Sequence, residues 1–193
     1  MPIRPRRRFL AAALFATALL TAALPATAVE PPAEWAAVVG AAHVLDDERT
    51  GMGGVEARLG LFRLPLAGRH LPIEPALGLT ANGDGGTYAY LSFRLDLAET
   101  VAALAGDPPP PPAAERPWRL VGYTGLGHYR PGDEGRELGG PLEFRSGLEL
   151  SRRLGPRTRL GLSFDHLSNA GIYDPNPGSE SLVLVLAWRP GAG

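Results

Sequence analysis

The sequence contains no cysteine, and its positive and negative charges nearly cancel. Without a thiol, the chain of 193 residues has no disulfide framework, no thiolate metal ligand and no cysteine nucleophile. A formal net charge of −1 argues against a general nucleic-acid binder. The 25 Gly and 20 Pro disfavour long helices, whereas a hydrophobic share of 45% is too high for a disordered chain. These totals favour many short strands joined by turns.

The first residues predict a secretory signal peptide. Four arginines precede the apolar run Phe9–Leu24, and Ala26-Thr27-Ala28 follows it as an A-x-A cleavage site. The alternative is an uncleaved N-terminal anchor helix, for which the run is short. Because residues 1–28 hold four arginines and no acid, their removal changes the net charge from −1 to −5. The remaining 29–193 form a single expected domain without another apolar run that is long enough for a transmembrane helix.

The mature sequence indicates eight β-strands, because its segments alternate between polar and apolar residues with a period of two. The clearest example is Thr87–Leu97, which sets Ala89, Leu91 and Phe93 against Tyr88, Tyr90 and Arg94. The other strands are expected at Trp35–Leu45, Val55–Leu61, Ile73–Thr80, Trp118–Tyr129, Leu142–Arg153, Arg159–Ser168 and Glu180–Arg189.

Most of these segments are long enough to cross a bilayer when tilted, and their number is even. The predicted fold class is therefore all-β: an eight-stranded antiparallel up-and-down transmembrane β-barrel. Alternation alone does not tell which face is outside. In a soluble barrel of the lipocalin kind, the same pattern is turned inside out.

A periplasmic N-terminus places four connections outside, at 46–53, 81–86, 130–140 and 169–179. The periplasmic turns are then 64–71, 98–117 and 154–158. Periplasmic turns of such barrels are short, and the turn at 98–117 is an exception. It contains Pro108–Pro112, which favours an extended, linker-like insertion.

Three polar residues stand on the apolar faces of the last two strands. His166 and Ser168 share a face with Leu160, Leu162 and Phe164, and Glu180 shares a face with the leucines of its strand. All three lie at strand ends beside the same outside loop, and such departures from local patterning point to function. They form a candidate acyl-transfer triad, with Ser168 as nucleophile, His166 as general base and Glu180 as the group that orients the imidazole.

The triad can form if the hairpin places Ser168 opposite Glu180, so that Glu180 lies diagonal to His166 and within side-chain reach. The candidate donors to a tetrahedral intermediate are Asn169, Asn176 and the backbone of Gly171. The alternative interpretation is structural. Polar residues are common at strand ends, and Asn-Ala-Gly and Asn-Pro-Gly are ordinary turn sequences.

The motif His166-Leu167-Ser168-Asn169-Ala170-Gly171 is followed by Asn176-Pro177-Gly178 and by Glu180. Further upstream are Gly125-Leu126-Gly127-His128-Tyr129, Leu138-Gly139-Gly140 and Glu143-Phe144-Arg145-Ser146. With these motifs the sequence, over about Trp118–Trp188, resembles the outer-membrane lipid A 3-O-deacylases of the PagL type.

The resemblance implies a Ser–His–Glu triad made of Ser168, His166 and Glu180 on the lipid-facing wall of an eight-stranded barrel. The implied reaction is hydrolysis of the ester-linked 3-hydroxyacyl chain at position 3 of lipid A, without a metal or another cofactor. The implied partners are lipopolysaccharide and outer-membrane lipids of a Gram-negative bacterium, with the site facing the outer leaflet. Two alternatives stay open: a non-catalytic outer-membrane barrel, and a soluble periplasmic barrel that binds a lipid inside.

Overall fold

The computed structural model describes residues 34–66, 69–133 and 135–191. The predicted signal peptide at residues 1–28 lies outside this part of the chain. Within the described ranges, no helix has both the length and the hydropathy needed to cross a membrane.

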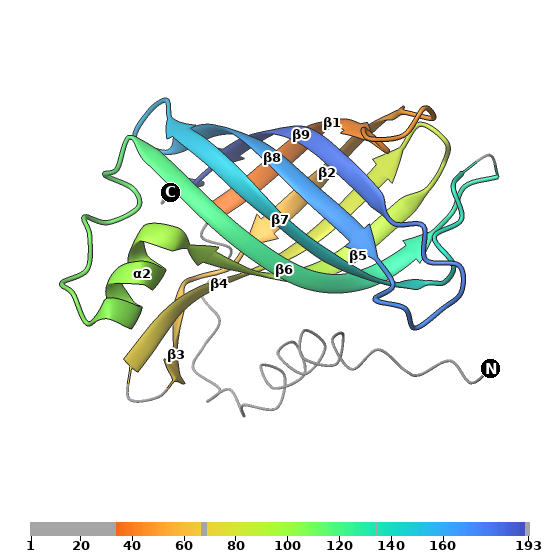
Figure 1. Ribbon diagram of the computed structural model, residues 1–193. Coiled ribbons are helices and arrows are strands. Elements are labelled where there is room, and N and C mark those ends of the chain that lie inside the picture. The colour runs from red at the N-terminus through yellow and green to blue at the C-terminus, as the bar shows by residue number, and fades with distance from the viewer. Residues whose placement is uncertain (1–33, 67–68, 134, 192–193) are drawn as a thin grey trace, which may run out of the picture.

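In the described residues the chain forms a series of antiparallel strands and one helix, α2 (Leu97–Ala105) (Figure 1). The strands are β1 (Glu34–Ala42), β2 (Thr50–Arg58), β3 (Phe62–Leu66), β4 (Arg69–Asn82), β5 (Thr87–Asp96), β6 (Trp118–Arg130), β7 (Leu142–Arg153), β8 (Thr158–Ser168) and β9 (Ser179–Trp188). In Figure 1, α2 and the β3–β4 hairpin lie at one end of the sheet, and the loops that follow β6 and β8 lie at the other end.

The sheet closes into a barrel. Sequence neighbours pair except for β2 and β3, β1 also pairs with β9, and β2 pairs with the second half of β4. Across the described residues, this makes a closed antiparallel barrel of eight strands, since β3 pairs only with the first residues of β4. The predicted fold class is therefore confirmed, and closure leaves the barrel without open edges.

Two connections differ from the sequence prediction. The expected short turn at 64–71 contains the end of β3 and the beginning of β4, which extend the barrel wall as a separate hairpin. The expected linker-like insertion at 98–117 begins with α2. This helix is capped because the Asp96 carboxylate accepts hydrogen bonds from the N–H groups of Ala98 and Glu99, and Gly106 ends it in the left-handed conformation.

The structure also answers which face of the sheet is outside. Along β9, Leu182, Leu184 and Leu186 are 41–52% exposed, whereas Val183 and Val185 between them are buried. The same alternation runs along β6, β7 and β8, so an apolar surface surrounds the barrel. A barrel that binds a lipid in its interior would bury these residues instead. The outward apolar wall is the arrangement that hydrocarbon chains of a bilayer favour.

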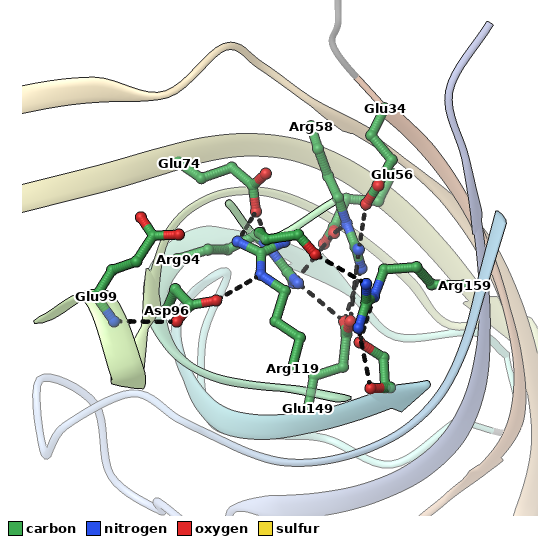
Figure 2. A network of polar contacts seen from close by, with 12 residues as sticks. Glu34, Glu56, Arg58, Glu74, Arg94, Asp96, Glu99, Arg119, Glu149 and Arg159 are labelled. Carbon is green, nitrogen blue, oxygen red and sulfur yellow. Dashed lines mark hydrogen bonds and ion pairs between the residues drawn. The ribbon is translucent and has the colours of Figure 1, made fainter. Parts of the chain in front are cut away.

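The barrel interior near the α2 end is filled by buried ion pairs (Figure 2). The Arg58 guanidinium, 1% exposed, donates to Glu34 and Glu56 at 2.8 Å and to Glu149 at 2.7 Å. The network continues through Glu74, Arg94, Asp96 and Arg119. Each of these eight side chains therefore has an oppositely charged partner, which offsets the cost of burying it. This network ties six strands together across the lumen, β1, β2, β4, β5, β6 and β7, and makes the barrel a rigid support for the residues on its wall.

Candidate active site

His166 and Glu180 form a hydrogen-bonded pair on the outer wall of the barrel. His166 comes from the end of β8 and Glu180 from the start of β9, and the two residues are direct cross-strand partners. The Nδ1 atom of His166 lies 2.9 Å from Glu180 Oε1. The side chains are 45% and 23% exposed, so the pair is accessible from outside. Because Nδ1 faces the carboxylate, Nε2 is the ring atom that is left for proton exchange.

Ser168 lies two residues beyond His166 on the same face of β8. Its hydroxyl makes no hydrogen bond within the described part of the chain, so Ser168 and His166 are neighbours without being bonded to each other. Catalytic hydrogen bonds are often long in substrate-free enzymes and shorten when substrate binds. The structure thus brings the three predicted residues to one face and joins two of them.

The strand register differs from the one that the sequence suggested. Glu180 lies directly opposite His166, and pairing of β8 with β9 ends at Leu167 and Ser179. Our expected pairing of Ser168 with Glu180 is therefore wrong, although the outward direction of both His166 and Glu180 is preserved. The reason is local: Gly178 adopts the left-handed conformation (φ 71°) and ends the loop just before β9 begins.

The loop between β8 and β9 is organised by one buried amide. The Asn169 side chain, 0% exposed, donates from Nδ2 to the carbonyl oxygens of Leu138 at 2.9 Å and Pro175 at 3.1 Å. Its Oδ1 accepts a hydrogen bond from the N–H of Gly171 at 2.9 Å. The backbone N–H of Asn169 in turn donates to Asn176 Oδ1 at 3.0 Å. Asn169 therefore shapes the loop, and its own amide hydrogens are both used.

Two donors of the same loop remain open. Neither Nδ2 of the exposed Asn176 nor the N–H of Ala170 makes a hydrogen bond to any of the described residues. Ala170 has a positive φ of 54°, which turns its backbone sharply just after Ser168 and Asn169. The loop thus offers the side-chain amide of Asn176, whose oxygen binds the residue after Ser168, and the backbone amide of Ala170, two residues after Ser168.

Gly178 is a site residue that the sequence indicated only through the motif resemblance. A Cβ atom at this position would lie 2.8 Å from His166 Cε1 and 3.6 Å from Nε2. The glycine therefore packs directly against the imidazole ring on the side away from the Glu180 bond. Any side chain here would push the ring, so the absence of a side chain is a steric requirement of this site.

His43 fixes the start of β9 from the neighbouring strand. It follows β1 in the left-handed conformation (φ 57°), and its Nδ1 lies 2.9 Å from the Ser179 hydroxyl. Next to it, the N–H of Val44 donates to the carbonyl oxygen of Glu180 at 3.0 Å. Burial, together with the Arg136 guanidinium, lowers the pKa of His43, which favours the neutral imidazole. Sequence periodicity gave no signal for this contact, which joins residues far apart in the chain.

The described residues contain no group of three or more His, Asp or Glu side chains that could hold a metal ion. The groups of the site that can take part in acyl transfer are the Ser168 hydroxyl, the His166 imidazole and the Glu180 carboxylate.

A comparison with known protein families finds a match over the segment that carries the candidate site. A model of the family described as "Lipid A 3-O-deacylase (PagL)" matches residues 112–189, which contain β6 to β9 and the three predicted triad residues. Over these residues the chain is similar to the PagL family. The lipid A deacylase PagL of Bordetella bronchiseptica is 35% identical over 54 residues, which cover 28% of this chain and 30% of that protein. The match thus spans less than a third of this PagL relative.

The crystal structure of the outer membrane enzyme PagL supports the fold over a larger region. It matches this structure with a TM-score of 0.56 and 18% sequence identity, and the match covers 82% of this chain and all of that one. At this level of identity the likeness shows a shared barrel architecture. The family match and the barrel thus agree on a PagL-type outer-membrane protein.

Proposed function

We propose that this PagL-family protein is an outer-membrane esterase that removes the ester-linked 3-hydroxyacyl chain at position 3 of lipid A. The observation that carries the proposal is the hydrogen bond between His166 and Glu180 on the apolar outer wall, with Ser168 beside it on the same face. The family and the Bordetella relative, both named for lipid A deacylation, supply the substrate class.

The proposed roles follow from the atoms that remain free. Glu180 accepts the hydrogen of Nδ1, fixes the tautomer of His166 and stabilises the imidazolium that forms. Nε2 then acts as the general base on Ser168 Oγ. The apolar wall lowers the local dielectric constant, which strengthens the interaction of the charged imidazolium with Glu180.

The reaction proceeds in two balanced steps. Ser168 Oγ attacks the ester carbonyl carbon and passes its proton to His166 Nε2, and this proton then leaves with the sugar hydroxyl as the ester bond breaks. Water next attacks the acyl-serine with help from His166, which releases the 3-hydroxy fatty acid and restores the serine hydroxyl. The carbonyl oxygen carries negative charge in both steps.

We assign the stabilisation of this oxyanion to the loop that follows β8. The free donors are Asn176 Nδ2 and the N–H of Ala170, whereas Asn169 and the N–H of Gly171 bond to each other. In this assignment Asn169 and Gly171 are positioning residues that hold the two donors in place.

The proposal also places the site in the outer leaflet. The site lies at the end of the barrel opposite α2, at the loop between β8 and β9 (Figure 1). A periplasmic N-terminus puts this end on the cell exterior, where lipid A is the principal lipid of the leaflet.

The decisive experiment expresses the full chain in a Gram-negative host and records the mass of its lipid A. Wild-type protein is expected to remove the mass of one hydroxyacyl chain, and Ser168→Ala is expected to leave lipid A intact. A matched control is Ser163→Ala, which changes a buried serine on the inward face of the same strand. Identical lipid A from wild type and Ser168→Ala would reject the esterase and favour a non-catalytic barrel.

A further inference from the structure

A row of polar side chains crosses the apolar wall beside the candidate triad. The outward residues in the middle of β6 and β7 are Leu or Phe, or lack a side chain, except for Thr124 and Ser146. Thr124 is the cross-strand partner of Ser146, and Ser146 is the partner of His166. Because His166 also pairs with Glu180, the four polar residues occupy one continuous row over four strands.

The adjacent row toward the α2 end is entirely apolar. It consists of Gly122, Leu148, Phe164 and Leu182, paired in the same order across the same strands. On the other side of the row lie Leu126 and Phe144. Thr124 and Ser146 are therefore hydroxyl-bearing positions surrounded by side chains that favour hydrocarbon.

These two hydroxyls have no protein partner. Both side chains are exposed, and neither makes a hydrogen bond to any described residue. A polar group that faces hydrocarbon without a partner is unfavourable, and such groups in membrane proteins are associated with function. A lipid that carries its own hydroxyl group at this depth would satisfy them.

We propose that Ser146 and Thr124 are specificity-determining residues that select an acyl chain with a 3-hydroxyl group; this inference rests on the proposed esterase function. The 3-hydroxyl is three bonds from the carbonyl carbon that Ser168 attacks, so it lies a few ångströms from the reacting atoms. Directly opposed residues in a sheet have Cβ atoms about 5 Å apart. Ser146 is directly opposite His166 and diagonal to Ser168, about 7–8 Å from it, so its hydroxyl is within reach of the 3-hydroxyl when the ester is at Ser168.

Thr124 extends the same polar track by one more strand, about 5 Å further from His166. Together the two side chains offer donors and acceptors on one side of the ester, while Glu180 and the loop donors occupy the other side. A chain without a 3-hydroxyl would leave Ser146 unpaired in an apolar surface. Sites that hydrogen-bond a substrate hydroxyl discriminate against the analogue that lacks it.

The test compares two synthetic lipid A analogues that differ only in the 3-hydroxyl of the ester-linked chain at position 3, presented in detergent micelles. Wild-type protein is expected to hydrolyse the hydroxylated analogue with the higher kcat/KM. Ser146→Ala and Thr124→Val are each expected to lower kcat/KM for this analogue by about tenfold while the other analogue is hydrolysed as by wild type. Ser146→Thr keeps a hydroxyl and is expected to restore most of the preference.

Thr158→Val is the matched control, since Thr158 lies at the opposite end of β8 from His166. It is expected to leave the ratio of the two kcat/KM values unchanged. Equal hydrolysis of both analogues by wild type, or an unchanged ratio in folded Ser146→Ala and Thr124→Val, would overturn the selection of the hydroxyl while leaving the esterase intact. Hydrolysis of neither analogue by wild type would overturn the proposed function itself and this inference with it.

Discussion

Replacing Gly178 by alanine tests how closely the imidazole of the candidate triad is held. The new methyl carbon would lie 2.8 Å from His166 Cε1, whereas ordinary contacts begin at 3.4 Å, so the ring has to move by about 0.6 Å. The bond that it would disturb is the 2.9 Å contact to Glu180. Productive catalytic geometry tolerates about 0.5 Å, and a displacement of about 1 Å can cost roughly 100-fold in rate. We therefore expect kcat to fall by about 10- to 100-fold.

The same substitution also strains the backbone, because an alanine with φ near 71° costs about 1–2 kcal/mol. Gly85→Ala separates the two effects. Gly85 has a similar φ of 82°, but a Cβ there meets only Gly132 Cα at 3.4 Å. Both variants are expected to lose similar unfolding free energy, and only Gly178→Ala is expected to lose activity.

The assay measures lipid A deacylation in detergent micelles beside urea unfolding for wild type and both variants. A folded Gly178→Ala protein with wild-type kcat would refute the steric argument. Equal losses of kcat in both variants would assign the effect to backbone strain and not to contact with the ring.

Three further changes probe other parts of the molecule. Arg58→Ala leaves Glu149 and its neighbours without their counter-charge, and we expect it to lower the unfolding free energy by about 3–5 kcal/mol in urea titrations. The control is Arg152→Ala, which replaces an exposed arginine and is expected to change the unfolding free energy by less than about 0.5 kcal/mol. Glu180→Ala is expected to lower kcat by about 10²- to 10⁴-fold without a change in thermal stability. If the variant had the kcat of wild type, Glu180 would have no role in the mechanism. Asp96→Ala removes the N-cap of α2, worth about 1 kcal/mol, together with the ion pairs to Arg116 and Arg119. It is expected to speed proteolysis within 97–117 while kcat stays unchanged, and equal proteolysis would contradict the role of Asp96 in holding this segment.

Much of the barrel was predictable because a lipid-facing wall imposes a strict period of two. The strand around Tyr90 follows that period without interruption, and the strand around Phe144 follows it except at Ser146; the structure has them as β5 and β7. The α2 helix was missed since its residues follow a strand directly and precede a proline-rich stretch. Its signals were the Asp96 cap and Gly106, which are short and easily read as an ordinary turn.

The site was predictable in its residues and less so in its geometry. His166, Ser168 and Glu180 each break the apolar pattern of their strand, and periodicity detects such breaks. Strand register depends on how the loop folds, and here the buried Asn169 and the positive φ of Gly178 decide it. The contact of His43 with Ser179 joins opposite ends of the chain, so no local pattern could reveal it.

The filled lumen decides how the proposed lipid substrate can reach the candidate site. Because ion pairs around Arg58 and Arg94 occupy the interior, a substrate cannot pass along the barrel axis to a site on the outer wall. It has to approach sideways, by diffusion in the plane of the membrane. The relevant substrate concentration is then the mole fraction of lipid A in the leaflet or micelle. Adding inert detergent at a constant total amount of lipid A lowers this mole fraction. The reaction should then slow down, because enzyme and substrate meet less often within the plane of the membrane or micelle.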